Sequence, residues 1–572
     1  MTITATHAGD TPVNVSGDTP VNVSDDTPVN VSGWLPVMAS QQPDALSVAV
    51  AKKGGGYTRI TAGELDAMCD RAAHALTAAG VTKGMRTVLM VTPSPEFFAI
   101  TFALFKLGAV PVMVDPGMGI KNLGQCLAEA EPEAFIGVPK AHIARLLFRW
   151  ARRTLRVHVT VGPKVFWGGH RYERLVSAAP ETALEVEASE PEGLAAILFT
   201  SGSTGVPKGV LYTHAMFTAQ IDSLRTAFGI EPGEVDLSTF PLFALFGPAL
   251  GMASVVPEMD ASRPGASDPK KLIGAIHDFE CTNMFASPAL VNLIGRYAED
   301  HAVEMPSLRR VISAGAPASV ASLERLTRHL DADAEILTPY GATESLPTTR
   351  IGSREILEET GEKTSTGAGV CVGVPVEGME VAVIGITDEA IDTWNDDLRV
   401  PTGTIGELVV KGPVVSRAYF KREESTRLAK IACTDGSFRH RMGDVGYLDD
   451  QGRVWMCGRK AHRVELDGET LFTIPCEAIF NAHEAVFRTA LVGVEGAGNE
   501  PGKKQAVLCV ELEEGKKPSA ALTEELLALG QAHDHTRQIT TVLYHPSFPV
   551  DVRHNAKIFR EKLTVWAQKQ SR

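Results

Sequence analysis

Apolar positions along this chain alternate between two spacings after residue 34. A helical spacing comes first, with one apolar face made of Leu65, Met68, Cys69, Ala72 and Leu76. Gly80 marks the end of this helix, because glycine accepts the backbone conformation that closes one. A short apolar run at residues 88–91 then predicts a buried strand.

Residues 94–114 repeat this pairing of a helix with a strand. Ser94, Pro95 and Glu96 supply a cap, a first-turn proline and an acid, all typical of a helix N-terminus. Gly108 ends the helix, and residues 109–114 predict the next strand. Units of this kind predict an α/β fold, a large N-terminal domain whose mostly parallel sheets are covered by helices.

The pattern changes near residue 458. Apolar runs at residues 491–494 and 505–511 predict strands of a smaller α+β unit. We therefore expect three parts: a tail at 1–33, a large domain at 34–457 and a small domain at 458–572.

The tail contains an octapeptide that occurs three times in residues 9–32, with Asp-Thr-Pro-Val-Asn-Val-Ser in every copy. A proline in each copy and few apolar residues favour disorder. The Val-Asn-Val alternation leaves a small β array as the alternative. No catalytic role is assigned to the repeats.

Composition narrows the function classes. The chain has 572 residues, 44% of them hydrophobic and 22% charged, as in soluble globular proteins. A net charge of −14 argues against a nucleic-acid-binding protein. Eight cysteines without a Cys-x-x-Cys pair argue against a zinc or redox motif and favour a reduced, cytoplasmic setting. The most apolar window, residues 97–114, contains Lys106, Gly108 and Pro111, so we expect no transmembrane segment.

Residues 199–209 carry the strongest chemical signal. They read Phe-Thr-Ser-Gly-Ser-Thr-Gly-Val-Pro-Lys-Gly and follow an apolar run at 194–198 that predicts a strand. Glycines let backbone N–H groups approach a polyphosphate, hydroxyl groups donate hydrogen bonds, and lysine supplies charge. The P-loop of NTPases is excluded, because that loop ends Gly-Lys-Ser/Thr and here Gly209 follows Lys208.

This loop resembles the phosphate loop of the adenylate-forming enzymes, which include acyl-CoA synthetases, luciferases and the adenylation domains of peptide synthetases. The resemblance implies ATP and Mg²⁺ as cofactors, an adenylation domain at 34–457 and a mobile C-terminal domain with a hinge near residues 459–463. It implies catalytic roles for Thr204 and Lys208. The ATP-binding residues that it implies in the loop are Thr200, Ser201, Gly202, Ser203 and Gly205.

Further motifs follow in the family's order. Pro-Tyr-Gly-Ala-Thr-Glu at 339–344 resembles a segment whose tyrosine, here Tyr340, stacks on adenine. By the same resemblance Thr343 contacts the α-phosphate, and Glu344 holds Mg²⁺ together with Thr204. The remaining nucleotide contacts that the resemblance implies are Gly341 and, in the loop at 313–317, Gly315, Ala316 and Pro317.

Two motifs near the C-terminus complete the set. Met-Gly-Asp at 442–444 and Gly458-Arg459 resemble the segment in which Asp444 binds the ribose hydroxyls and Arg459 assists. Arg-His-Asn-Ala-Lys-Ile at 553–558 resembles the segment whose lysine, here Lys557, bridges the carboxylate and the α-phosphate. Each of these residues alone is an ordinary surface charge. Their joint order supports the assignment of catalysis to Lys557, Glu344, Thr204 and Lys208.

The chain departs from the family pattern near the hinge. Met442 replaces the usual threonine, Ala461 follows Gly-Arg-Lys, Ala244 lies where many members have a polar residue, and Ala556 precedes Lys557. Family members use the hinge region to admit coenzyme A, so these changes favour a second step without it. Drift within an ordinary acyl-CoA ligase is the alternative.

These departures, with the segments at 198–214 and 338–347, resemble one branch of the family. That branch converts long-chain 2-alkyl-3-hydroxy acids into β-lactones during bacterial olefin (hydrocarbon) biosynthesis. The resemblance implies that the acid becomes an acyl adenylate and that its own 3-hydroxyl then attacks, giving a β-lactone, AMP and pyrophosphate. An internal nucleophile has a high effective concentration. Assembly with other enzymes of that pathway is implied by the same resemblance.

Several alternatives remain open from the sequence. A long-chain acyl-CoA ligase requires coenzyme A, and a fatty acyl-AMP ligase requires a carrier protein; a nucleotide-binding protein without catalysis is the third. His214 and His462 are candidate bases for the hydroxyl by residue type only. The apolar segment 240–256 fits either an acyl tunnel or ordinary core.

Overall fold

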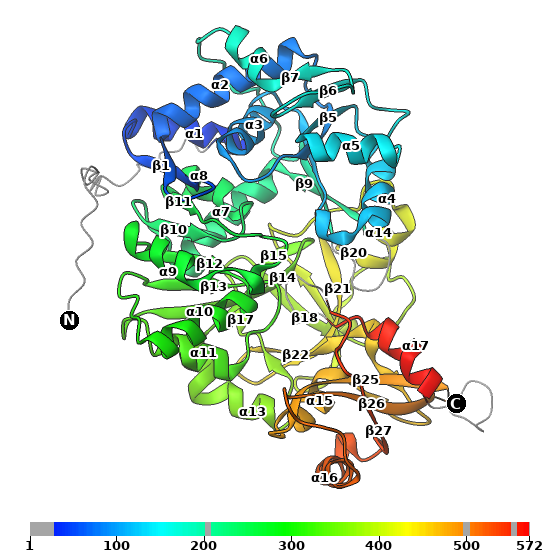
Figure 1. Ribbon diagram of the computed structural model, residues 1–572. Coiled ribbons are helices and arrows are strands. Elements are labelled where there is room, and N and C mark those ends of the chain that lie inside the picture. Colours follow the sequence, from blue (N-terminus) through cyan, green and yellow to red (C-terminus); the bar gives the residue numbers. More distant parts are fainter. Residues whose placement is uncertain (1–27, 201–206, 496–503, 551–557, 571–572) are drawn as a thin grey trace, which may run out of the picture.

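The chain folds into a large N-terminal part and a small C-terminal part that lie against each other (Figure 1). The computed structural model describes residues 28–200, 207–495, 504–550 and 558–570. Up to Arg459 the described chain builds three sheets, and a two-stranded and a three-stranded sheet follow. This arrangement confirms the predicted fold class, a large α/β domain and a small α+β domain.

The first sheet has seven strands in the order β7-β6-β5-β3-β4-β8-β9, and its neighbouring strands are parallel except for β9, which is antiparallel to β8. Its strands are β3 (Arg86–Met90), β4 (Val110–Met113), β5 (Ala134–Gly137), β6 (Val157–Thr160), β7 (His170–Arg171), β8 (Leu194–Phe199) and β9 (Gly209–Thr213). Successive side chains point to opposite faces. Leu89 packs with α2 (Ala62–Ala78) and α3 (Pro95–Lys106), and Val88 packs with α4 (Ile120–Ala130). Helices therefore cover both faces, as predicted.

The second sheet has nine strands in the order β17-β15-β14-β13-β12-β10-β11-β1-β2. Its strands are β1 (Leu46–Ala51), β2 (Tyr57–Thr61), β10 (Val235–Ser238), β11 (Ala253–Val256), β12 (Asn283–Ala286), β13 (Arg310–Ser313), β14 (Glu335–Ala342), β15 (Ser345–Gly352) and β17 (Val374–Pro375). The centre from β1 to β14 is parallel, and the edge pairs are antiparallel. On one face, Met284 packs with α9 (Pro269–Asp278) and α10 (Pro288–His301). On the other, Ile312 shares a core with α7 (His214–Phe228).

The third sheet is antiparallel throughout and was not predicted. Its strands are β16 (Val370–Cys371), β18 (Glu380–Ile384), β19 (Gly406–Lys411), β20 (Lys430–Ala432), β21 (Phe438–Leu448) and β22 (Val454–Arg459). Val409 joins one apolar cluster, whereas Leu408 and Val410 join another, so β19 is apolar on both faces. The sequence pattern of such a strand resembles that of a buried parallel strand, which explains the missed topology.

The other helices of the large part are short or peripheral. They are α1 (Trp34–Gln41), α5 (Pro139–Leu147), α6 (Tyr172–Ala178), α8 (Gly247–Leu250), α11 (Val320–Thr327), α12 (Ser353–Glu355), α13 (Gly361–Ser365) and α14 (Glu423–Ala429). Capping follows the sequence where it was predicted: the Ser94 hydroxyl accepts from the Phe97 N–H at the start of α3. Gly80 and Gly108 have φ of 98° and 63°, the left-handed values that close α2 and α3.

The small part follows a one-turn helix, η7 (Lys460–His462), and contains the two predicted strands. Its elements are β23 (Val464–Glu465), β24 (Thr470–Leu471), α15 (Thr473–Asn481), β25 (Val486–Glu495), β26 (Lys504–Leu512), α16 (Ala520–Gln531), β27 (Thr541–Tyr544) and α17 (Arg560–Gln570). β26 pairs with β25 in antiparallel and with β27 in parallel register. Figure 1 shows this part at the lower right, beside β22.

Residues 28–33, which the sequence placed in the tail, pack against the large domain. Val31–Gly33 form a one-turn helix in which all three residues are buried. The Asn30 side-chain amide donates to the backbone carbonyl of Phe105 at 2.8 Å and to the Ser189 hydroxyl at 3.1 Å. The packed chain therefore begins before residue 34, because the end of the last repeat supplies both apolar and hydrogen-bonding groups. Residues 1–27 lie outside the described chain.

Two further expectations concern membrane-spanning helices and the state of the cysteines. Across the described helices, none is both long and apolar enough to cross a membrane. The eight cysteines are free thiols, and all except the half-buried Cys433 are buried.

Candidate functional site

Tyr340, Asp444 and Arg459, from three strands, meet in one cluster, which we call the Asp444 cluster. Asp444 on β21 lies directly opposite Arg459 on β22 in the antiparallel register. The Arg459 guanidinium contacts the carboxylate at 3.0 Å (Nε to Oδ1), and the Tyr340 hydroxyl, from β14, donates to Oδ2 at 2.7 Å. The structure thus brings together three residues that are far apart in the sequence and that the motifs assigned to one nucleoside.

Burial sets the charges of the Asp444 cluster. Asp444 is 2% exposed and Tyr340 is 8% exposed. Burial and the neighbouring carboxylate hold the pKa of Tyr340 far above its usual value, so this phenol stays a hydrogen-bond donor. The Asp444 charge raises the pKa of Arg459. The cluster is therefore a compact ion pair with a hydrogen bond from the phenol.

The tip of the β14–β15 hairpin carries the next predicted residues. Tyr340 pairs with Thr349, and Ala342 pairs with Ser345, with an irregular register between them. Gly341 fits because an added Cβ would lie 2.4 Å from the backbone oxygen of Ser345. The chain reverses direction at this point, so Thr343 and Glu344 lie on the turn.

Glu344 lies in a second group, the Glu344 cluster, with Lys208, Tyr419 and Lys430. The Tyr419 hydroxyl donates to Glu344 Oε1 at 2.7 Å. The Lys208 ammonium lies 4.7 Å from the centre of the Tyr419 ring, a cation–π contact. Burial lowers the pKa of Lys208, whereas the Glu344 charge acts in the opposite direction. A cation and a carboxylate thus share one aromatic side chain.

Lys430 is a member of this cluster that sequence reasoning missed. Its ammonium donates to the backbone oxygen of Ser416 and, at 3.3 Å, to the Ser416 hydroxyl. The Ser416 N–H in turn donates to the Glu344 carbonyl at 2.8 Å. Burial lowers the pKa of Lys430 to about 7. Lysine at the end of a polar helix usually extends into solvent, so no sequence signal set this residue apart.

His440 adds a buried imidazole beside Lys430. It pairs with Lys430 across β20 and β21 and is 2% exposed. Its Nδ1 lies 3.2 Å from the Ala429 carbonyl. Burial and then the Lys430 charge hold the pKa of His440 well below its usual value, so this ring stays neutral.

The two ends of the loop that is predicted to bind phosphate are held together by hydrogen bonds. The Thr200 N–H donates to the Lys208 carbonyl at 3.0 Å, and the Lys208 N–H donates to the Thr200 hydroxyl at 3.3 Å. These bonds continue the β8–β9 ladder, in which Phe199 pairs with Gly209. The predicted residues Ser201, Gly202, Ser203, Thr204 and Gly205, and the predicted catalytic Lys557, lie outside the described chain.

The loop at 313–317 follows β13, whose last residue, Ser313, is buried. Gly315 has a φ of 101°, which disfavours a side chain, and Ala316 and Pro317 follow it. The parallel strands β12, β13 and β14 end at this edge of the sheet, which also carries the β14–β15 hairpin. The position fits a ligand site at the carboxyl ends of parallel strands.

An aromatic wall lies next to the Glu344 cluster. The Tyr212 hydroxyl donates to the Thr343 carbonyl at 2.6 Å, and the Tyr212 ring lies 5.2 Å from the Phe217 ring. From there ring contacts continue from element to element. The aromatic wall consists of Phe217 on α7, Phe243 and Phe246 on the one-turn helix η3 (Phe243–Phe246), Phe240 before it and Phe285 on β12.

The two candidate bases lie in different surroundings. His214 is the first residue of α7, is 4% exposed, and has its pKa lowered by burial. His462 Nε2 contacts Glu561 at 3.1 Å, within the small domain. The structure therefore does not bring them into one group.

Charged contacts fix the segment predicted to be the hinge. The Lys460 ammonium donates to the Thr387 carbonyl at 2.8 Å and pairs with Glu407 at 3.3 Å. Arg463 pairs with Asp388 at 3.2 Å. These contacts tie both ends of η7 to the large domain in this arrangement. Movement about residues 459–463 stays a prediction.

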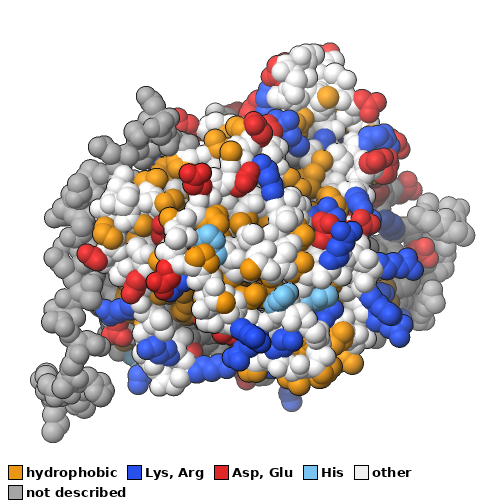
Figure 2. Space-filling model, turned by 90° about the horizontal axis from the view of Figure 1, so that it is seen from above, with side chains coloured by type: hydrophobic (Ala, Val, Ile, Leu, Met, Phe, Trp, Pro, Cys, Tyr) orange, Lys and Arg blue, Asp and Glu red, His pale blue; other side chains and the backbone are white. Residues whose placement is uncertain are grey.

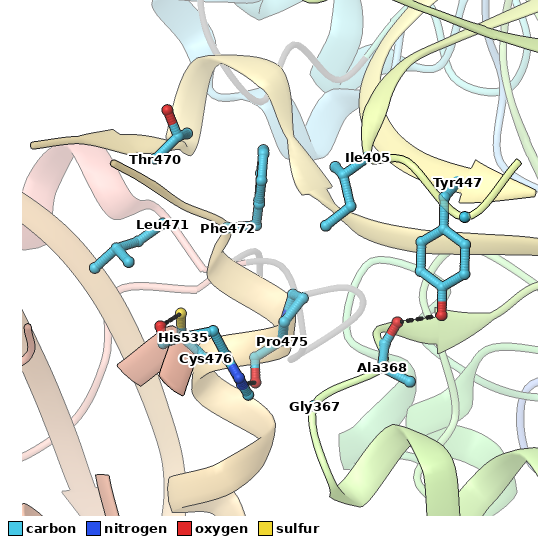
Figure 3. Close-up of a pocket in the computed structure, with 11 residues that line it drawn as sticks. Gly367, Ala368, Ile405, Tyr447, Thr470, Leu471, Phe472, Pro475, Cys476 and His535 are labelled. Carbon is cyan, nitrogen blue, oxygen red and sulfur yellow. Dashed lines mark hydrogen bonds between the residues drawn. The ribbon is translucent and has the colours of Figure 1, made fainter. Parts of the chain in front are cut away.

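A pocket of about 260 Å³ lies between the two domains. Figure 3 shows Tyr447 and Ala368 on one side of it and Phe472, Pro475 and Cys476 on the other, with the Tyr447 hydroxyl bonded to the Ala368 carbonyl at 3.0 Å. None of the predicted site residues lines it. It lies at the domain interface, apart from the residues predicted to bind the nucleotide.

The described part of the site offers few protein ligands for a metal ion. Within the described ranges, no group of three or more His, Cys, Asp or Glu side chains could hold an ion alone. Glu344, at a hairpin tip and only partly buried, is a single carboxylate. One carboxylate suits Mg²⁺ that is shared with substrate phosphates, which is the usual arrangement for nucleotide-bound magnesium.

Comparisons with known proteins agree with this geometry. The family model described as AMP-binding enzyme matches residues 36–420. The chain is 48% identical over 545 residues to the olefin beta-lactone synthetase of Xanthomonas campestris pv. campestris, covering 93% of this chain and 96% of that protein. A protein with the same name from Stenotrophomonas maltophilia is 48% identical over 541 residues, with the same shares covered. ATP-bound MatB from Rhodopseudomonas palustris superposes with a TM-score of 0.76 over 96% of this chain and all of that one, at 20% identity.

Proposed function

The chain belongs to the AMP-binding enzymes, the adenylate-forming family, and from this premise we propose that it is an ATP-dependent β-lactone synthetase. Its substrate is a long-chain 2-alkyl-3-hydroxy acid, and its products are the β-lactone, AMP and pyrophosphate. The observation that carries the proposal is the 48% identity, over 93% of this chain, to two proteins named olefin beta-lactone synthetase. The Asp444 and Glu344 clusters, each of which brings together residues that are distant in the sequence, support the ATP-dependent step.

In the first step a substrate carboxylate oxygen attacks the α-phosphorus of ATP, and pyrophosphate leaves. The Asp444 cluster holds the nucleoside: Asp444 accepts from the ribose hydroxyls, and Tyr340 lies against the base. Lys208 neutralises the phosphates. Burial lowers its pKa, and a bound anion would act in the opposite direction by favouring the charged ammonium. Mg²⁺, when bound to Glu344, Thr204 and the phosphates, supplies charge stabilisation for the transferring phosphoryl group. Lys557 completes the set as the bridge between carboxylate and α-phosphate.

In the second step the 3-hydroxyl oxygen attacks the activated carbonyl carbon. A C–O bond closes the four-membered ring, the hydroxyl proton is lost, and AMP leaves with the former carboxylate oxygen. The reaction is intramolecular, so no second substrate must enter. The aromatic wall receives the alkyl chains, since its Phe217 lies beside Tyr212, whose hydroxyl donates to the Thr343 carbonyl. The departures around Met442 and Ala461 fit a hinge that need not admit coenzyme A.

The proposal extends to the setting of the enzyme. The chain acts in the cytoplasm within bacterial olefin biosynthesis, and it assembles with other enzymes of that pathway. Free buried thiols support a reducing compartment. A β-lactone is strained and reactive, so direct transfer to a following enzyme would protect it.

A product analysis tests the proposal. Full-length protein, ATP and Mg²⁺ are incubated with a long-chain 2-alkyl-3-hydroxy acid, with and without coenzyme A, and the lipids are examined by NMR at low temperature. We expect β-lactone and an equal amount of AMP without coenzyme A. A thioester formed only with coenzyme A would instead establish an acyl-CoA ligase. A matched substrate without the 3-hydroxyl should release pyrophosphate but give no lactone.

A further inference from the structure

One surface of the molecule carries a charge pattern opposite to that of the whole chain. From Ala134 to Tyr172 there is no Asp or Glu, although the chain has a net charge of −14. The acids that flank this stretch, Glu133 and Glu173, already pair with Arg86 and Arg171. The exposed basic side chains within it are Lys140, Arg149, Arg152, Arg153, Arg156 and Lys164. In the part of the chain that the structure describes, none of the six forms an ion pair.

Large apolar side chains are exposed among these cations. Leu147 is 72% exposed and Phe166 is 76% exposed. Figure 2 looks down on the end of the molecule that carries α6 and β7, where hydrophobic and basic side chains lie side by side along the lower edge of the view. We define the 140–166 patch as the six basic residues and the exposed Ile143, Leu146, Leu147, Phe148, Val165 and Phe166.

Helix α5 shows that this exposure is built into the fold, because its polarity is reversed. Ile143 and Leu147, one helical turn apart, face outward. His142 and Arg145 face inward: His142 Nε2 lies 3.0 Å from the Val159 carbonyl, and the Arg145 guanidinium lies 5.8 Å from the centre of the Phe135 ring. A helix on a soluble surface normally places its apolar side inward. The outward face of α5 therefore suits an apolar surrounding.

Fixed contacts hold the rest of the 140–166 patch beside α5. The Trp167 ring stacks on His142 at 5.6 Å, and its indole N–H donates to the Thr160 hydroxyl at 2.9 Å. Phe166 packs edge-on against Trp167 at 5.4 Å, so it stays next to the helix. At the other end Phe148 stacks on the buried Trp150 at 5.8 Å. The exposed rings of Phe148 and Phe166 thus pack against the buried rings of Trp150 and Trp167.

We propose that the 140–166 patch binds the surface of a lipid bilayer that contains anionic lipids. The apolar side chains enter the boundary between headgroups and acyl chains, and the six cations face the anionic headgroups. This combination of outward apolar groups and uncompensated basic charge is typical of interfacial membrane binding. An acidic protein would match the charge but not the protruding Leu147 and Phe166. Because the remainder of the chain is acidic, this face meets less repulsion from an anionic membrane than a surface with the average charge of the chain would.

Membrane binding goes beyond the proposed function and does not depend on it. If the substrate is a long-chain acid, the patch also brings the enzyme to the phase that holds that substrate. Binding is measured without substrate or ATP, so its failure is distinct from a failure of the proposed reaction.

The test is vesicle flotation with the full-length protein. Vesicles of phosphatidylcholine alone are compared with vesicles containing about one third phosphatidylglycerol, in low salt and in 0.5 M salt. We expect retention on anionic vesicles only, and its loss in high salt because surface charge is then screened. The variant R149E/R152E/R153E should bind at least about 100-fold more weakly, at about fivefold for each cation near an anionic surface.

Matched variants separate the patch from overall charge. K52E/K53E/K270E changes the net charge equally at exposed lysines elsewhere and should bind as the parent does. Phe166→Ser should weaken binding several-fold in low salt, whereas Phe487→Ser, at another exposed phenylalanine, should not. Equal binding by the two triple variants would overturn the proposal. Absence of vesicle binding at every lipid composition would also overturn it. If the protein captured an acidic protein instead, the patch would be a protein-docking surface and the membrane proposal would be wrong.

Discussion

Asp444 receives a guanidinium and a phenol hydroxyl within 3.0 Å, whereas the amines of Lys208 and Lys430 have no carboxylate at that distance among the described residues. The Asp444 cluster is neutralised within itself. The Glu344 cluster holds two amines whose pKa values are lowered by burial, with one carboxylate nearby. The Asp444 cluster is thus balanced in charge, whereas the Glu344 cluster contains more basic than acidic groups.

This difference matches the two ends of the proposed ligand. A nucleoside is uncharged, so a closed ion pair with hydrogen-bonding capacity is sufficient to hold it. A triphosphate brings several negative charges and requires cations that no protein acid has already satisfied. We therefore expect changes in the Asp444 cluster to lower stability and binding together. Changes in the Glu344 cluster should affect the reaction more than the fold.

The largest expected effect is on the reaction rate. Lys208→Met removes a cation that acts on the developing phosphate charge, and loss of one well-placed donor costs about 10²–10³ in rate. ATP–pyrophosphate exchange in the presence of the acid measures it. The melting temperature should not fall, because burial of Lys208 is not repaid by a carboxylate partner. A folded Lys208→Met enzyme with near-normal exchange would remove this residue from the mechanism.

Lys557→Ala should have an effect of the same order on the adenylation step, by the role that the family resemblance gives this lysine. Pyrophosphate release measures it, and circular dichroism should show an intact fold. Normal pyrophosphate release by the folded variant would contradict the assignment. Lys562→Ala, at a neighbouring lysine of the small domain, is the matched control.

Asp444→Ala should lower the free energy of unfolding by about 2 kcal/mol, because it leaves a half-buried guanidinium and a buried phenol without their acceptor. ATP affinity should fall in the same variant. Chemical denaturation and nucleotide titration measure the two quantities. A variant that lost affinity but kept full stability would show that the Asp444 cluster is not a prebuilt element.

Lys430 makes stability depend on pH. Its pKa is about 7 in the folded chain and near 10.5 when unfolded, so the unfolded chain binds more protons between these values. Stability should therefore rise with pH across this window, by at most about 1.4 kcal/mol per pH unit from this group. Lys430→Met should flatten that dependence, and denaturation at pH 7, 8 and 9 measures it. An unchanged slope would show that Lys430 does not titrate in this range.

The smallest effect is expected in the aromatic wall. Phe240 is half exposed and stacks on Phe285 at 6.0 Å. Phe240→Ala should raise KM for the long-chain acid two- to tenfold, as expected for one aromatic contact of about 0.5–1.5 kcal/mol, and leave KM for ATP unchanged. An equal rise for both substrates would place the wall outside the acyl site.

Part of this picture followed from the sequence. The helix and strand pairs such as α3 and β4 were predicted because caps and glycines mark their ends. The motif residues Tyr340, Asp444 and Arg459 were identified by resemblance, and the fold brings them together. The antiparallel third sheet was not predicted, since a strand that is apolar on both faces has a sequence pattern that does not distinguish parallel from antiparallel pairing.

Lys430 was missed for a different reason. Its role depends on burial beside β21 and on the Ser416 carbonyl, neither of which a local pattern shows. The point at which the packed chain begins was not predicted for a similar reason, because Asn30 and Val31 find their partners only in the folded large domain. Contacts between distant segments decide both cases.

Transfer of a carboxylate oxygen to AMP tests the central claim most directly. The 2-alkyl-3-hydroxy acid is labelled with ¹⁸O in both carboxylate oxygens and converted with ATP and Mg²⁺ in the absence of coenzyme A. The account predicts one ¹⁸O in each AMP and one in each β-lactone, because the oxygen that attacks the α-phosphorus leaves with AMP. Unlabelled AMP, or label in pyrophosphate, would contradict an acyl adenylate that closes on its own hydroxyl.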